Sequence, residues 1–89
     1  MKGETKSGFK FVISDNIKKD FRFWRKLSKL ANDPFKAFEL YEELLGTEQL
    51  DKLEKHVENK QGIAPIDKIE KEISEIFAIL GQDSDTKNS

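Results

Sequence analysis

The sequence predicts a mostly α-helical fold, a compact array of about four helices preceded by one short N-terminal β-strand. Three observations lead to this prediction. Apolar and polar residues alternate in one short segment near the start, apolar residues recur at three- and four-residue steps in later segments, and Gly or Pro separates those segments. The chain has 89 residues, of which 36% are hydrophobic, so we expect a single small domain, over residues 8–81, with a modest core.

The strand is expected at residues 8–14, where Phe9, Phe11 and Ile13 share one side of the alternating pattern. Aromatic and β-branched residues at a period of two are typical of a half-buried strand. Residues 1–7 are polar, and we expect them to be a disordered lead-in. No other segment has a strand pattern, so this strand must pair with the lead-in, with another subunit or with a partner.

Four helices are expected after the strand, each with an apolar stripe at helical spacing. They cover residues 17–31, 34–45, 48–61 and 65–80. Pro34 suits the first turn of the second helix, whereas Gly46 and Gly62 suit helix ends. The last helix is expected to end at Gly81, and residues 82–89 form a polar tail that we expect to be disordered.

Charge is distributed unevenly along the chain, although the net charge is only −1. Residues 1–32 carry nine Lys or Arg and three acids, which gives 9 − 3 = +6. Residues 33–89 carry seven Lys and fourteen acids, which gives 7 − 14 = −7. Either the two parts neutralise each other within one fold, or the basic part of one copy meets the acidic part of another copy or an acidic partner. Nucleic acid is a less favoured partner, because the acidic part would repel phosphate.

The composition excludes several kinds of active site. The chain has no Cys and one His, which excludes disulfides, thiolate zinc sites and metal sites built from His. We expect His56 to lie at the rim of the third helix, and the acidic groups Glu42/Glu43 and Glu70/Glu72/Glu75 to be solvated. No apolar run approaches the roughly 18 residues that a membrane span needs. We therefore expect a soluble intracellular protein that is not an enzyme and has no catalytic residues, cofactor or metal.

The aromatic residues near the start exceed what so small a core is expected to bury. Phe21, Phe23 and Trp24 cover more than half of the circumference of the first helix. Either this helix lies in the middle of the fold, or it presents aromatic rings beside arginines to a partner, as interface hot spots do. The surplus predicts a homo-oligomer or a partner complex. The predicted protein-interaction residues are Phe9, Phe11, Phe21, Arg22, Phe23, Trp24 and Arg25.

The order of these signals resembles that of a known family. An aromatic strand precedes a helix with aromatic residues near its start, and three segments follow: NDPF at 32–35, LLGTEQLDKLEKHV at 44–57 and EISEIF at 72–77. Over about residues 8–80 the chain resembles the small tail assembly chaperones of long-tailed phages and prophages of Gram-positive bacteria. It departs from the family pattern in its first helix, which is basic here rather than acidic at its start.

The resemblance implies a non-enzymatic phage tail assembly chaperone that binds the tape measure protein during tail morphogenesis. Some such chaperones are also made as a longer form by ribosomal frameshifting, and the resemblance implies that such an extension would recruit the tail tube protein. The resemblance also implies a location in the cytoplasm of the host bacterium and absence from the finished virion. Two alternatives stay open: a generic bacterial protein-interaction module with no phage link, and a small nucleic-acid-binding or regulatory protein that uses the basic first helix through Arg22, Arg25, Lys26 and Lys29.

Overall fold

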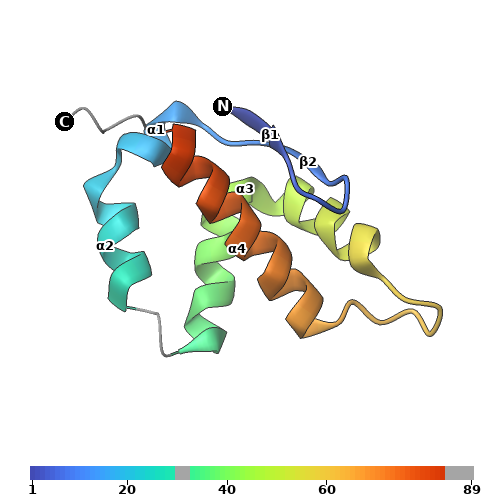
Figure 1. The fold of residues 1–89 in the computed structure, drawn as a ribbon. Coiled ribbons are helices and arrows are strands. Elements are labelled where there is room, and N and C mark those ends of the chain that lie inside the picture. Colours follow the sequence, from blue (N-terminus) through green and yellow to red (C-terminus); the bar gives the residue numbers. More distant parts are fainter. Residues whose placement is uncertain (30–32, 84–89) are drawn as a thin grey trace.

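The computed structural model describes residues 1–29 and 33–83. Within these residues a β-hairpin is followed by four helices (Figure 1), so the predicted mostly helical fold is confirmed. The elements are β1 (Lys2–Glu4), β2 (Lys10–Val12), α1 (Asp15–Lys19), α2 (Phe21–Lys29), α3 (Pro34–Val57) and α4 (Ile66–Asp83). α3 and α4 lie side by side, and α2 lies against α3. The hairpin crosses one face of this pair, with β2 against α3 and β1 against α4.

The polar segment at the start of the chain is a strand, so the prediction of a disordered lead-in is wrong. β1 pairs antiparallel with β2, with Gly3 directly opposite Phe11. A Cβ atom at position 3 would lie only 2.5 Å from Cζ of Phe11, so the absence of a side chain lets the aromatic ring lie over the backbone of β1. The strand expected at residues 8–14 therefore pairs with the lead-in, which is one of the three pairings that the sequence leaves open.

The helix predicted at residues 17–31 is two helices, α1 and α2, separated at Asp20. This residue has an extended backbone conformation (φ −85°, ψ 105°). Its carboxylate accepts a hydrogen bond from the backbone N–H of Arg22 at 2.9 Å, so Asp20 caps the start of α2. Ser14 caps α1 in the same way, through the N–H of Asn16 at 3.1 Å. The predicted end of this helix, at residues 30–31, lies outside the described residues.

The helices predicted at 34–45 and 48–61 are the two halves of α3, which bends at Gly46. Gly46 has φ 83° and ψ 156°, outside the helical region, and a residue without a Cβ adopts this conformation at little cost. α3 ends at Val57 rather than at residue 61. α4 continues past the predicted end at Gly81 as far as Asp83.

The predicted disordered tail starts at residue 82, but the helix includes residues 82 and 83, so that part of the prediction is wrong. The remainder of the predicted tail, residues 84–89, lies outside the described residues.

The carboxylate of Asp33 accepts a hydrogen bond from the backbone N–H of Lys36 at 3.3 Å, which caps the start of α3.

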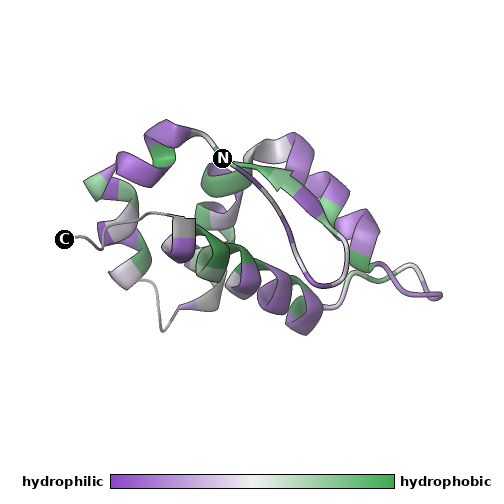
Figure 2. Ribbon diagram, turned by 45° about the horizontal axis from the view of Figure 1, so that its top comes forward, coloured by the Kyte–Doolittle hydropathy of each residue, from purple (hydrophilic) through white to green (hydrophobic). Residues whose placement is uncertain are grey.

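The core lies between the hairpin and the helices. β2 and its flanking residues place Phe9, Phe11 and Ile13 on the inner side of the hairpin, where each is at most 5% exposed. Among the described residues, the helices contribute eight further buried hydrophobic side chains, namely Phe23, Leu40, Leu44, Leu45, Leu53, Ile73, Ile76 and Leu80. Figure 2 shows hydrophobic and hydrophilic residues alternating along the helical ribbons, as expected for helices with one buried side.

Across residues 1–29 and 33–83, no helix is both long enough and apolar enough to cross a membrane.

Candidate protein-binding site

The fold divides the seven residues that the sequence assigns to an interface. Phe9, Phe11 and Phe23 are 5%, 1% and 1% exposed, so they belong to the protein's own core. Assigning these three residues to a partner surface is therefore wrong for this fold. The physical reason is that β1 covers the hairpin side of the core, while the ring of Phe23 packs against that of Phe77 with centroids 6.3 Å apart.

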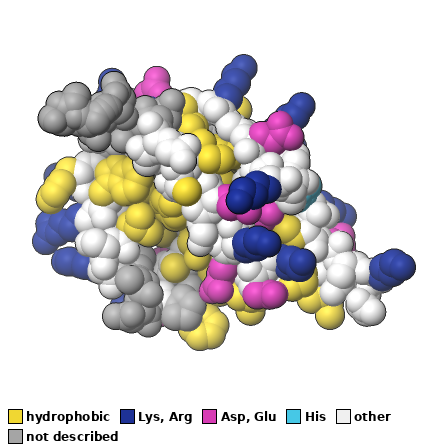
Figure 3. Space-filling view, viewed as in Figure 1, with side chains coloured by type: hydrophobic (Ala, Val, Ile, Leu, Met, Phe, Trp, Pro, Cys, Tyr) yellow, Lys and Arg dark blue, Asp and Glu magenta, His cyan; other side chains and the backbone are white. Residues whose placement is uncertain are grey.

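The predicted interface residues that remain accessible lie on the outer face of α2. Phe21 is 73% exposed, and Arg22 and Arg25 are exposed beside it. Trp24 is half-buried, its ring lies edge-on to Phe23 at 5.4 Å, and its Nε1 donates to the backbone carbonyl of Lys18 at 2.9 Å. Figure 3 shows Lys and Arg side chains at the left edge of the molecule, over α2. This face is therefore basic and carries one exposed aromatic ring.

The outer edge of β2 is partly closed by a side chain. The backbone N–H of Val12 donates to Oε1 of Gln49 at 2.7 Å, and Nε2 of Gln49 donates to the carbonyl of Val12 at 2.7 Å. The same Nε2 also donates to the carbonyl of Leu45 at 2.7 Å. These contacts occupy the groups with which Val12 would bind a further strand. The sequence reading missed Gln49, whose only signal is its place just after the bend at Gly46.

A cluster of polar side chains joins the hairpin turn to α3 and α4. Glu72 is 5% exposed, so the prediction that it is solvated is wrong. Its carboxylate instead accepts from the hydroxyls of Thr5 and Ser7, each at 2.7 Å. Oγ of Ser7 also lies 2.9 Å from Nε2 of His56. His56 is exposed, as predicted for a residue at the rim of its helix.

The proton count defines what this cluster can do. An ionised carboxylate only accepts hydrogen bonds, so the single hydroxyl proton of Ser7 is directed at Glu72. Nε2 of His56 must then carry the proton that it donates to Ser7, so the imidazole is not placed as a base for the Ser7 hydroxyl. The cluster therefore acts as a clamp that fixes the hairpin turn onto the helices.

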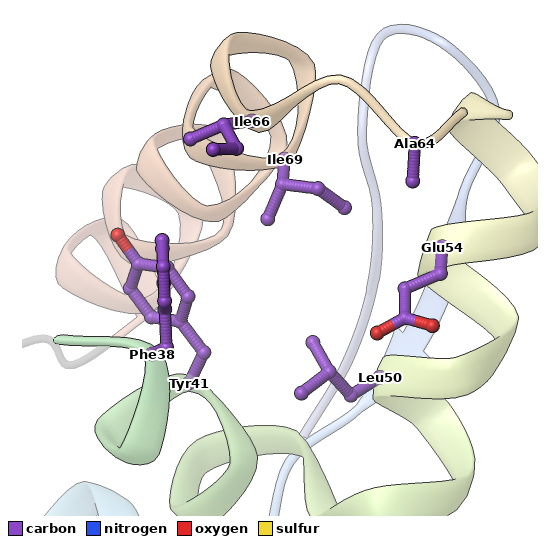
Figure 4. Close-up of a pocket in the computed structure, with 7 residues that line it drawn as sticks. All are labelled: Phe38, Tyr41, Leu50, Glu54, Ala64, Ile66 and Ile69. Atoms are coloured by element: carbon purple, nitrogen blue, oxygen red, sulfur yellow. The ribbon is translucent and has the colours of Figure 1, made fainter. Parts of the chain in front are cut away.

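A mainly apolar concavity lies where the two halves of α3 meet the start of α4, and we call it the α3–α4 hollow (Figure 4). Its volume is about 250 Å³, and it is lined by Phe38, Tyr41, Leu50, Glu54, Ala64, Ile66 and Ile69. The bend at Gly46 creates it: Phe38 and Tyr41 precede the bend, Leu50 and Glu54 follow it, and the two halves form facing walls. Ile66 and Ile69, from the first turns of α4, form the third wall.

Apolar side chains continue from the hollow onto the surface. The rings of Phe35, Phe38 and Tyr41 form a row along α3, with centroids 6.0 Å and 5.9 Å apart. Phe35 is 77% exposed and Ile66 is 59% exposed. Ile63, just before the lining residue Ala64, is 56% exposed. Large apolar side chains that are contiguous and exposed mark a binding surface more often than single ones do.

The charged group that lines the hollow is acidic, whereas Lys52 and Lys55 line an adjoining depression that shares Glu54 and Ala64 with it. Glu54 lies in its wall. Burial, and secondly the negative charge of Glu70, raise the pKa of Tyr41 above its ordinary value of 10.0. The lysines of α4, Lys68 and Lys71, instead line a different depression beside the polar clamp. Among the described residues that line the α3–α4 hollow, none is Lys or Arg.

The size and lining of the hollow favour side chains of a partner as its occupant. Sites for small molecules and cofactors usually have volumes of about 300–1,000 Å³ and several convergent polar groups, whereas this hollow is smaller and mainly apolar. Within residues 1–29 and 33–83, no three His, Cys, Asp or Glu side chains are grouped in a way that could hold a metal ion.

Comparisons of the chain with protein-family models, curated proteins and solved structures found no match.

Proposed function

We propose that this protein is a non-enzymatic phage tail assembly chaperone that binds the tape measure protein during tail morphogenesis in the host cytoplasm. The observation that carries the proposal is the α3–α4 hollow with its exposed apolar border, Phe35, Ile63 and Ile66. A surface of this kind suits a helical segment that lays its apolar face into a groove. The tail tube protein is the further partner in this proposal, and the finished virion does not contain the chaperone.

The magnitude of the apolar contact suits a partner that must later be released. Fully covering one large apolar side chain contributes about 1.5–3 kcal/mol. Association itself costs on the order of 4–15 kcal/mol in lost translational and rotational freedom. A few exposed side chains around one small hollow therefore support reversible binding, which a chaperone that leaves the assembly needs.

The segment that carries the family resemblance also has a clear structural role, which supports the proposal. Leu44 and Leu45 are 3% and 5% exposed and lie in the core. Gly46 provides the bend that opens the hollow, and Gln49 holds β2. Two of the residues that line the hollow, Leu50 and Glu54, belong to the segment at 44–57 that carries the resemblance.

Co-expression with a tape measure protein tests the proposal directly. The native chain should increase the soluble yield of the tape measure protein, and Ile66→Ser should reduce that gain several-fold. Val12→Ser is the matched control, because Val12 is 53% exposed and Ile66 is 59% exposed, but Val12 lies on the hairpin outside the hollow. No gain in soluble tape measure protein with the native chain would contradict the proposed function.

The basic outer face of α2 favours a second candidate, binding of nucleic acid. Arg22, Arg25 and Lys29 are exposed there, and Lys26 forms an ion pair with Glu43 at 3.2 Å. Binding to oligonucleotides that weakens steeply with salt would support this function. No binding at low salt would remove it. A third candidate, a bacterial interaction module unrelated to phages, is distinguished by its gene neighbourhood, which would lack genes for tail proteins.

A further inference from the structure

We infer that the α3–α4 hollow binds an amphipathic partner helix whose apolar face is bordered by Lys or Arg side chains. This inference rests on the proposed function in one respect, namely that the hollow is the surface on which the partner docks. It adds the chemical class of the partner segment, which the proposed function does not define.

The first step of the argument is the shape of the hollow. Three helical segments surround it, and Figure 4 shows Phe38 and Tyr41 on one wall facing Leu50 and Glu54 on the other. A volume of about 250 Å³ has room for one or two large side chains, not for a whole helix. The partner helix must therefore lie across the opening and insert anchors, while its neighbouring apolar residues cover Phe35 and Ile66. Anchors at positions i, i+3 or i+4, and i+7 provide such a face.

The second step is the charge around the hollow. Glu54 lines it, and Glu70 lies close enough to Tyr41 for its charge to oppose ionisation of the phenol. The nearby lysines lie outside the hollow itself: Lys68 and Lys71 line the depression on the side of the polar clamp, and Lys52 and Lys55 line the depression beyond Glu54. A partner with basic residues beside its apolar anchors would meet opposite charges, whereas acidic residues in the same places would meet like charges.

The third step separates a foreign helix from a second copy of this chain. The basic helix α2 is the segment of this protein that most resembles the inferred partner. Its exposed face carries one large apolar side chain, Phe21, which is 73% exposed. One anchor cannot cover the hollow together with Phe35, Ile63 and Ile66, so a longer apolar face is required than α2 presents.

A set of three designed helical peptides tests the inference with the full chain. All three share one apolar face with anchors at i, i+4 and i+7, and the flanking positions are Lys, Gln or Glu. We expect the Lys peptide to bind at least tenfold more tightly than the Glu peptide at low salt, as measured by fluorescence anisotropy of the labelled peptide. The Gln peptide should fall between them, and the preference should shrink at high salt because surface charges are screened.

Two variants identify the surface and the source of the preference. Ile66→Ser should weaken the binding of all three peptides by a similar factor, because it removes apolar contact without changing charge. Glu54→Gln combined with Glu70→Gln should bring the three affinities to within about threefold of one another. Equal binding of the three peptides to the native chain, a preference for the Glu peptide, or no binding at all would overturn the inference.

The outcomes also separate this inference from the proposed function and from self-association. Selective binding of the Lys peptide without any gain in soluble tape measure protein would leave the inference standing and contradict the function. If the soluble yield of the tape measure protein rises in a way that depends on Ile66, but the three peptides bind equally, the proposed function stands and the inference about partner charge is wrong. If the chain alone forms oligomers in sedimentation that Ile66→Ser dissociates, a second copy occupies the hollow and the inference of a foreign helix is wrong.

Discussion

The side-chain amide of Gln49 completes the backbone hydrogen bonding of Val12, accepting from its N–H and donating to its carbonyl, each at 2.7 Å. A side chain of α3 thereby takes the position that a third strand would occupy beside β2. The contact attaches the hairpin to the helix and satisfies backbone groups that would otherwise face outward from the strand edge. The sequence-based idea that this edge recruits a neighbouring chain is therefore disfavoured at Val12.

Replacing Gln49 tests the strength of this attachment. Gln49→Ala removes three hydrogen bonds, two of them at exposed backbone groups that water can reach. We expect a loss of about 1–2 kcal/mol in the free energy of unfolding, measured by urea denaturation. Gln49→Glu tests the donor separately: it keeps the acceptor for the N–H of Val12 but sets a carboxylate oxygen against the carbonyls of Val12 and Leu45, so it should cost at least as much as Gln49→Ala. An unchanged urea midpoint for Gln49→Ala would show that the contact does not stabilise the fold.

Gly3 provides a second test, because the sign of the effect depends on the close approach of Phe11. In a strand, Gly→Ala commonly stabilises by roughly 0.5–1 kcal/mol. Here the new Cβ would lie 2.5 Å from Cζ of Phe11, so Gly3→Ala should destabilise by about 1–3 kcal/mol, as overpacking does. Thermal unfolding followed by circular dichroism measures the change.

The control for that prediction is the glycine in α4. Among the described residues, apart from its chain neighbours and the backbone of its own helix, no heavy atom lies within 4 Å of a Cβ built at Gly81, so Gly81→Ala should raise stability by up to about 1 kcal/mol. If Gly3→Ala also raises stability, the ring of Phe11 does not lie on the backbone of β1 as described.

The buried carboxylate of the polar clamp gives a third prediction. Glu72→Ala removes the acceptor that lies 2.7 Å from the hydroxyl of Thr5, a residue that is 4% exposed, and leaves only Oγ of Ser7 at 3.2 Å. We expect a loss of about 1–3 kcal/mol and faster hydrogen exchange of the hairpin amides, because the turn is no longer fixed to α4. Glu75→Ala is the matched control, since Glu75 accepts only an exposed bond from the N–H of Lys6 at 2.8 Å. Equal effects of the two substitutions would contradict the role of Glu72.

Local sequence signals were sufficient to locate most of the helices. Pro34 and Gly46 mark a helix start and a bend because their effects on the backbone are intrinsic to the residue. The break at Asp20 was missed because the apolar spacing continues across it, and only its role as a helix cap reveals the interruption. Gly81 misled the prediction because a glycine near a helix end is compatible with either continuation or a stop.

Tertiary contacts account for what the sequence could not predict. β1 has no strand pattern, and its pairing depends on Gly3 lying under the ring of Phe11. Phe9, Phe11 and Phe23 are buried because this added strand makes the core larger than the helices alone could form. The α3–α4 hollow was also missed, because its walls come from separate segments whose approach depends on the direction of the bend at Gly46.

The last prediction concerns pH, because burial and the charge of Glu70 raise the pKa of Tyr41 above 10.0. As the pH rises past 10.0, the unfolded chain loses the phenol proton first while the folded chain still holds it. The folded state then binds more protons, so stability must fall with rising pH until Tyr41 ionises in the folded state as well. The contribution is therefore fully present below pH 10.0 and is lost above it. Since Tyr41 is the only Tyr, its ultraviolet absorbance reports its ionisation directly.

Two substitutions separate the causes of this shift. Tyr41→Phe should remove the part of the alkaline loss of stability that comes from the phenol, leaving only the contribution of other groups such as lysines. Glu70→Gln should lower the pKa of Tyr41 while leaving it above 10.0, because burial is the larger cause and the glutamate charge the smaller one. A pKa at or below 10.0 in the native chain would mean that Tyr41 is not sheltered in the wall of the hollow. A full return to 10.0 in Glu70→Gln would mean that charge, not burial, controls this site.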